Sequence, residues 1–137
     1  MLTTQSQDTE QTIDLNSQES RQSMAKLVTR LFEVWELPTS DQLNLLGLSE
    51  TSRSMLIKYR KGNAIPNSRD MMDRIGWLLA IYKNLKLLFP FNQEFRNSWV
   101  LKRNQMMENL RPIDVMKEEG IIGIATIARH LDSLREQ

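Results

Sequence analysis

The stretch from Asn67 to Pro90 constrains the fold more than any other part of the chain, because it carries the longest uninterrupted helical pattern. Its apolar residues recur at intervals of three and four, which places them on one face of a helix. Asn67 is suited to cap the first turn, Asp70 lies favourably in the helix dipole, and Phe89-Pro90 ends the helix because proline disfavours a helical residue before it. The stripe consists of Met71, Met72, Ile75, Leu78, Leu79, Tyr82, Leu85 and Leu88.

A second apolar row on the same helix widens its hydrophobic arc. Trp77, Ile81 and Leu85 form this row together with Leu88. A single neighbouring layer covers only one stripe of a helix, so the wider arc predicts that this helix packs on two sides. Two explanations remain open at this point, which are burial inside one small domain and self-association of the chain.

Length, charge and composition exclude several classes of protein. A chain of 137 residues forms one domain or two very small ones. The absence of cysteine excludes disulfides and thiolate chemistry, and a single histidine, His130, argues against a zinc cluster or a catalytic triad. The longest apolar run, from Trp77 to Tyr82, is too short to span a membrane, and the N-terminus is polar and acidic, unlike a signal peptide. We therefore expect a cytoplasmic protein that is not an enzyme and binds no metal or cofactor.

The net charge of +1 hides an uneven distribution. The segment from Met1 to Ser20 has four acidic residues and no basic one, whereas the segment from Arg53 to Arg74 has six basic residues and two acidic ones. Residues 1–18 offer hardly an apolar anchor, and we predict a disordered tail there.

Three helices are expected between this tail and the central helix. The first carries Met24, Leu27, Val28, Leu31 and Trp35 at helical spacing and ends before Leu37-Pro38. The second begins at Thr39, which with Gln42 has the spacing of a capping box, and ends at Gly47, a residue suited to a left-handed helix end. The third runs from about Ser52 to Lys61, with Met55, Leu56 and Tyr59 facing inward and Gly62 at its end.

Three further helices are expected after the central one. Asn92 is suited to cap a helix with Phe95 and Trp99, and Pro112 suits the first position of a helix that ends at Gly120. A last helix carries apolar residues from Ile121 to Leu134. All four prolines fall at predicted helix boundaries, and no stretch alternates with the period of a strand, so the fold class is all-α.

The second and third helices have the outline of a helix-turn-helix, with Gly47-Leu48-Ser49 as the turn. The third helix is basic and can enter a major groove of DNA. Residues at its start and one turn further on suit base contacts, and Arg60 and Lys61 suit phosphate contacts. The alternative is a basic helix face that is merely solvated. The candidate DNA-binding residues are Ser52, Arg53, Ser54, Lys58, Arg60 and Lys61.

Three consecutive stretches, LLGLSETSRSMLIKYRKG, SRDMMDRIGWLLAIYKNLKLLFP and NSWVLKRNQMMENLRPIDVMKEEGIIGIATIARHLD, together resemble the Xre/MbcA/ParS-type antitoxins. The likeness covers roughly residues 22 to 134, and its elements follow the order of that family. The chain departs from the family between Asn104 and Pro112, where the family often has a glycine. The matching elements are Leu45-Leu46-Gly47, Arg74 with Leu78-Leu79, Trp99, Asn104, and Pro112 to Met116.

The resemblance implies an antitoxin of a bacterial type II toxin–antitoxin system. Such a protein dimerises, binds its own operator and blocks the active site of a toxin that degrades NAD or uses it for ADP-ribosylation. It implies a helix-turn-helix module at 19–66 and a helical toxin-binding domain at 67–137. Since the family contacts its toxin near the chain end, Arg129, His130 and Asp132 are the candidate toxin-binding residues. The alternative is that these three are ordinary exposed residues of a helix. Trp99 and Pro112 are expected to act as a core anchor and a helix start. The alternative function is a stand-alone transcriptional regulator without a toxin partner.

Overall fold

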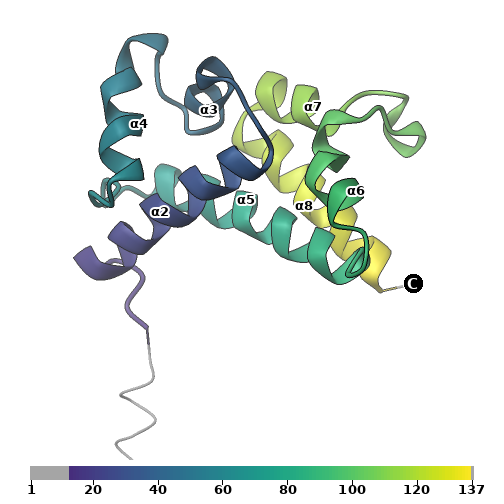
Figure 1. Ribbon diagram of the computed structural model, residues 1–137, viewed down its shortest axis with the longest axis horizontal. Helices are drawn as coiled ribbons and strands as arrows, with labels where there is room; N and C mark the ends of the chain where they lie inside the picture. Colours follow the sequence, from purple (N-terminus) through teal and green to yellow (C-terminus); the bar gives the residue numbers. More distant parts are fainter. Residues whose placement is uncertain (1–12, 137) are drawn as a thin grey trace, which may run out of the picture.

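The computed structural model describes residues 13–136, and its regular elements in that range are all helical (Figure 1). This confirms the all-α prediction. The predicted tail at 1–18 lies mostly outside the described residues, and Ser17 already caps the first described helix by accepting a hydrogen bond from the Ser20 amide. The α-helices are α2 (Gln18–Val34), α3 (Thr39–Leu45), α4 (Arg53–Arg60), α5 (Arg69–Leu88), α6 (Gln93–Ser98), α7 (Pro112–Glu119) and α8 (Ile121–Arg135), and the short 3-10 helices are η1 (Glu50–Ser52), η2 (Trp99–Leu101) and η3 (Gln105–Met107).

Helix α5 is the predicted central helix, and its ends differ slightly from the expectation. It begins one residue later than an Asn67 cap requires, because Ser68 is the capping residue and its hydroxyl accepts a hydrogen bond from the Met71 amide at 3.2 Å. The expected Asn67 cap is therefore wrong. The other end is as predicted, since the helix stops at Leu88 and Phe89 precedes the proline.

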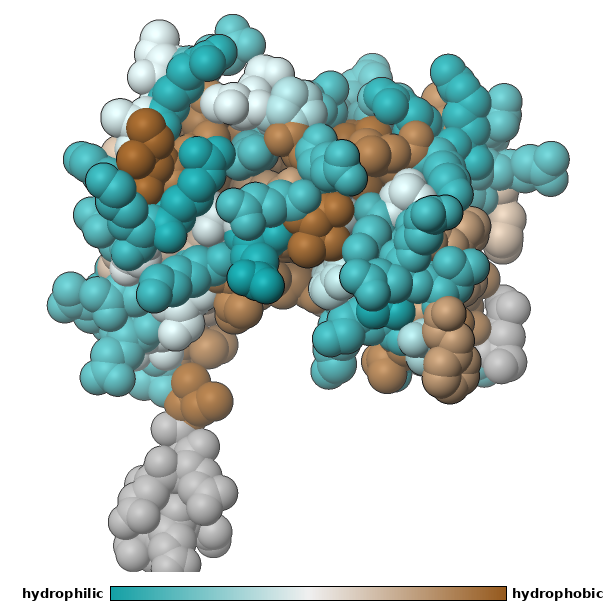
Figure 2. Space-filling view, in the orientation of Figure 1, coloured by the Kyte–Doolittle hydropathy of each residue, from teal (hydrophilic) through white to brown (hydrophobic). Residues whose placement is uncertain are grey.

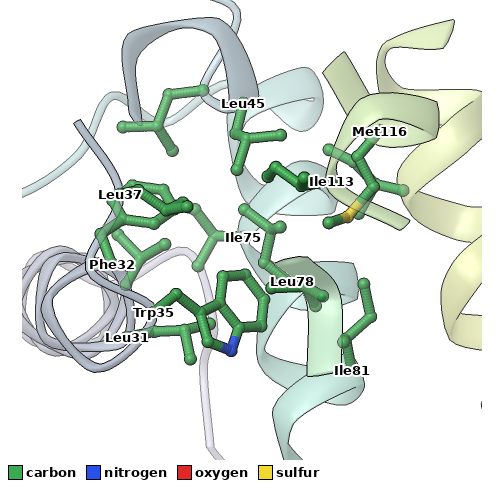
Figure 3. Close-up of a cluster of buried hydrophobic side chains, with 14 of the residues drawn as sticks. Leu31, Phe32, Trp35, Leu37, Leu45, Ile75, Leu78, Ile81, Ile113 and Met116 are labelled. Atoms are coloured by element: carbon green, nitrogen blue, oxygen red, sulfur yellow. The ribbon is translucent and has the colours of Figure 1, made fainter. Parts of the chain in front are cut away.

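The prediction that this helix packs on two sides is confirmed. Figure 1 shows α2 crossing one part of α5 while α8 runs alongside another. In Figure 3, Ile75 and Leu78 of α5 have Phe32 of α2 and Trp35, the residue just after α2, on one side and Ile113 of α7 on the other. Apart from Ala125, the buried apolar residues of the described range belong to one cluster, which joins both halves of the chain. A third face of α5, with Asp73, Gly76 and Lys83, remains exposed.

The turn after α3 has the hydrogen bonds of a Schellman motif. Leu48 donates its amide to the Leu43 carbonyl and Gly47 donates to Asn44, while Gly47 has a left-handed φ of 73°. Gly47 therefore ends the helix as predicted. The capping box expected at the other end is absent. Pro38 occupies the capping position, and the Gln42 side chain donates instead to the Leu37 carbonyl at 2.9 Å.

Arg74 of α5 ties this turn to the central helix. Its side chain donates to the Leu45 carbonyl at 3.3 Å and to Asp70 at 2.9 Å, and only 15% of it is exposed. The guanidinium lies so close to Gly47 that a Cβ atom there would stand 2.9 Å from the Arg74 Cζ. The glycine in the turn and the arginine on α5 thus form one structural unit.

The C-terminal helices begin where the sequence indicates, but α6 ends at Ser98, so Trp99 lies in η2 and not on the same helix as Phe95. Asn92 caps α6 by accepting from the Phe95 amide, Pro112 is the first residue of α7, and Gly120 separates α7 from α8. An ion pair of 2.8 Å between Lys117 of α7 and Asp41 of α3 links the two halves of the chain. Within residues 13–136, no helix is both long and apolar enough to cross a membrane.

We predict that Gly47→Ala lowers the free energy of unfolding by about 1–2 kcal/mol, because alanine is strained in the left-handed conformation and its Cβ displaces Arg74. Gly47→Asn should cost less, since asparagine tolerates this conformation. The measurement is urea unfolding followed by circular dichroism, with Asn44→Ala on the exposed side of α3 as the control. Equal stability of Gly47→Ala and the parent chain would contradict this account of the turn.

Candidate functional site

The outward face of α4 is the first candidate site. Leu56 and Tyr59 bury the opposite face against the core. Burial raises the pKa of the Tyr59 hydroxyl, so this group stays neutral behind the helix. The face turned to solvent carries Arg53, Ser54, Lys58 and Lys61, all exposed. The structure thus brings four of the six predicted DNA-binding residues together on one accessible surface.

The other two predicted residues lie at the margins of that face. Ser52 ends the 3-10 turn η1 and is half-buried, with its hydroxyl 3.3 Å from that of Ser49. Arg60 is exposed, but its guanidinium donates to Gln42 of α3 at 3.3 Å. Both are therefore held toward the turn and α3 more than toward the centre of the α4 face.

The charges on this face are not neutralised from within the chain. In the described range, no acidic side chain lies within ion-pair distance of Arg53, Lys58 or Lys61. Lys26 of α2 lies over Gly62 and shares with Lys61 a surface groove that Glu19 also lines. A surface of this kind can neutralise phosphates without first breaking internal ion pairs.

Ile57 is a surface residue of α4 that is not among the DNA-binding residues predicted from the sequence. It is 51% exposed and lies one turn after Arg53 and one turn before Lys61. Its position between two candidate contacts is visible in the sequence as a spacing of four on either side. An apolar group there suits contact with a thymine methyl group in a major groove.

The three predicted toxin-binding residues do not share one face of α8. The Arg129 guanidinium lies over the Trp77 ring of α5, 5.4 Å from its centroid. Asp132 accepts a hydrogen bond from Asn84, a residue of α5 that is only 3% exposed, and Arg135 donates to the same asparagine at 2.8 Å. Arg129 and Asp132 are thus both drawn toward α5.

His130 lies elsewhere on the helix. It is seven residues after Gly123, which packs against the backbone of α7, and so it lies on the α7 side of α8. Its Nε2 atom is buried and has no hydrogen-bond partner among the described residues.

The segment from Trp99 to Pro112 leads into α7, and η2 within it packs against that helix. Trp99 and Pro112 are buried, which confirms their expected roles as core anchor and helix start. Asn104 caps η3 through the Met106 amide and pairs its own amide with the Leu110 carbonyl. Where the resembling family often has a glycine, Glu108 and Asn109 both adopt left-handed conformations, with φ of 58° and 65°.

Charged groups stabilise the start of α7. Arg111 donates two hydrogen bonds to Asp114, at 2.7 and 2.9 Å. These bonds, with the positive charges of Arg111, Lys117 and Arg103, lower the pKa of Asp114 below its usual value. Among residues 13–136 no group of three acidic, histidine or cysteine side chains is placed to hold a metal ion.

Comparison with known proteins shows that the chain is similar to an uncharacterized protein. No protein-family model matches the chain, and no solved structure matches it. The uncharacterized protein y4oB of Sinorhizobium fredii (strain NBRC 101917 / NGR234) is 29% identical over 107 residues, which cover 77% of this chain and 79% of the relative. The likeness spans most of both chains and leaves the function to be argued from the site.

We predict that Glu108→Gly stabilises the protein by about 1 kcal/mol, because glycine removes the strain of a left-handed glutamate. The matched control is Glu118→Gly, an exposed glutamate inside α7, where glycine should destabilise by a similar amount. Both are measured as shifts of the urea midpoint. Changes of the same sign in the two variants would contradict the strain argument.

Proposed function

We propose that this protein is the antitoxin of a bacterial type II toxin–antitoxin system. In this proposal it acts in the cytoplasm as a homodimer, represses its own operon through the N-terminal helices, and neutralises an NAD-dependent toxin through the C-terminal helices. The protein itself performs no catalysis. The observation that carries the DNA-binding part is the exposed cationic face of α4 after the turn at Gly47, whose basic residues Arg53, Lys58 and Lys61 form no ion pair with the residues that the structure describes. The antitoxin part is supported by the sequence resemblance.

The proposed repression follows from the chemistry of the α4 face. Arg53 and Ser54 at the start of α4 are the base contacts, because the first turn of a recognition helix reaches deepest into the major groove. Lys58 and Lys61 lie one and two turns further on and contact phosphates. One such helix meets few phosphates, so two copies on two half-sites are needed for tight and specific binding.

The proposed neutralisation is steric. A toxin that binds NAD has a pocket for two phosphates, and an arginine delivered to that pocket excludes the dinucleotide by occupancy. Arg129 is the candidate, since it is exposed at the edge of α8 although it lies over Trp77.

A stand-alone transcriptional regulator is the second candidate function. The observation that favours it is the internal engagement of the C-terminal residues, because Asp132 and Arg135 are both bonded to Asn84. Co-expression with the neighbouring open reading frame, followed by co-purification, separates the two candidates. A stable complex supports the antitoxin, and a chain that purifies alone and still binds its promoter supports the regulator.

We predict that operator affinity falls with salt with a log-log slope of roughly −5 to −7, as expected for a dimer that contacts about six to eight phosphates. Lys61→Ala should weaken binding to all sequences alike, whereas Arg53→Ala should also relax base preference. The measurement is fluorescence anisotropy over a salt series, with Lys102→Ala as the control for loss of one exposed lysine. Unchanged promoter affinity in a folded Arg53, Lys58 and Lys61 triple alanine variant would show that α4 is not the DNA-binding helix.

We predict that Arg129→Glu reduces neutralisation of the toxin, because glutamate is shorter than arginine, fills less of the pocket and lacks the guanidinium donors. The measurement is growth rescue on co-expression with the cognate toxin. Arg30→Glu on the exposed side of α2 makes the same substitution away from α8 and should rescue as the parent chain does. Full rescue by Arg129→Glu would place the blocking surface elsewhere on the molecule.

A further inference from the structure

A groove on α5 shares only Trp77 with the sites described above. It has a volume of about 470 Å³ and opens to solvent between α5 and the start of α2. In Figure 2 the lower edge of the molecule is hollowed, and apolar side chains lie along the roof of this hollow. The groove is lined by Leu15, Met24, Met72, Asp73, Gly76, Trp77 and Ala80.

Gly76 lies in the middle of α5 without a reason in the single chain. A Cβ atom there would meet nothing within 4 Å, and the glycine is exposed. Glycine is also one of the least favourable residues for a helix interior. A glycine at such a place is explained when another helix approaches this face closely.

The residues around Gly76 form a continuous seam on the solvent side of α5. Its members are separated by four, three, four, three and four residues, the spacing at which two helices pack along their length. The side opposite the seam carries the buried residues Ile75, Leu78 and Leu85. The seam consists of Arg69, Asp73, Gly76, Ala80, Lys83 and Leu87.

The seam is complementary to itself when a second α5 runs in the opposite direction. Measured from Leu78, Gly76 and Ala80 are each two residues away, and Asp73 and Lys83 are each five residues away. A twofold axis at the level of Leu78 therefore sets each glycine against an alanine and each aspartate against a lysine of the other copy.

We infer that the solvent face of α5 is the contact between two copies of this chain, packed antiparallel about Leu78, with Asp73 paired to Lys83 across the twofold axis. The choice of a second copy rests on this charge complementarity, since an unrelated partner has no need of a self-complementary seam. In the single chain Asp73 has only a long, exposed pair with Arg69 at 3.7 Å, and Lys83 lies in no ion pair of the described residues. Leu87, which is 52% exposed, is covered in the pair.

This inference deepens the proposed function, because a dimer that reads two half-sites needs a defined interface. Its test does not depend on DNA or on a toxin. Mass and dissociation constant are measured on the purified full-length chain by sedimentation equilibrium, and promoter binding is measured separately. A dimer that binds no DNA would count against the proposed function alone.

The decisive experiment exchanges the paired charges. Asp73→Lys and Lys83→Asp should each raise the dissociation constant of the dimer at least about tenfold, because like charges then face each other. The double variant Asp73→Lys with Lys83→Asp should restore it to within about threefold of the parent value. Glu118→Lys, an exposed site on α7 with the same change of charge as Asp73→Lys, is the matched control and should leave the dimer intact.

A second variant separates the interface from stability. Gly76→Leu should abolish the dimer by filling the contact and should raise the melting temperature of the monomer, since leucine favours a helix more than glycine does. A parent chain that is monomeric at micromolar concentration overturns the inference. So does a dimer that survives Gly76→Leu or one in which the double charge exchange gives no rescue. A monomeric parent whose seam variants lose a co-expressed partner would assign the face to that partner and also overturn it.

Discussion

The burial of α5 on two sides is the constraint on which the rest of this structure depends. Ile75, Leu78 and Leu85 are fully buried, and each full burial of such a side chain is worth about 1.5–3 kcal/mol relative to exposure. Because α2 covers one part of this helix and α8 another, the N-terminal and C-terminal helices share a single core. The two halves of the chain are therefore not independent bodies, and a change in α5 affects both.

Polar contacts to α5 determine how its neighbours are oriented. Arg74 binds a carbonyl at the end of α3 and so positions the turn that leads to α4. Near the other end, the buried Asn84 binds Asp132 and Arg135 and so positions the last turn of α8. A buried amide left without partners costs about 1–3 kcal/mol, which favours this one arrangement over alternatives of similar hydrophobic burial. The same helix thus sets the place of both candidate sites.

The two candidate surfaces differ in what they require of a partner. The α4 face is open and cationic, and within residues 13–136 it has no ion pair, so a polyanion meets it without breaking such contacts. The α8 edge is engaged with α5 through Trp77 and Asn84, so a partner that uses Arg129 or Asp132 must compete with contacts inside the chain. The ion pair between Asp41 and Lys117 joins α3, which precedes the α4 face, to α7, which precedes α8.

The sequence by itself determined the helices and most of their ends, because helical periodicity, prolines and left-handed glycines act over a few residues. It also indicated the charged face of α4, since Arg53, Lys58 and Lys61 share one helix. Only the tertiary structure decided that Ser68, not Asn67, caps α5, that Gln42 turns back to Leu37, and that Arg129 lies over Trp77. For the contacts of α8 the physical reason is distance along the chain: Trp77 and Asn84 are about fifty residues before their partners on α8, and no local pattern records which of them meet. At Ser68 and Gln42 the choice is local, because neighbouring polar side chains are similarly able to cap a helix end.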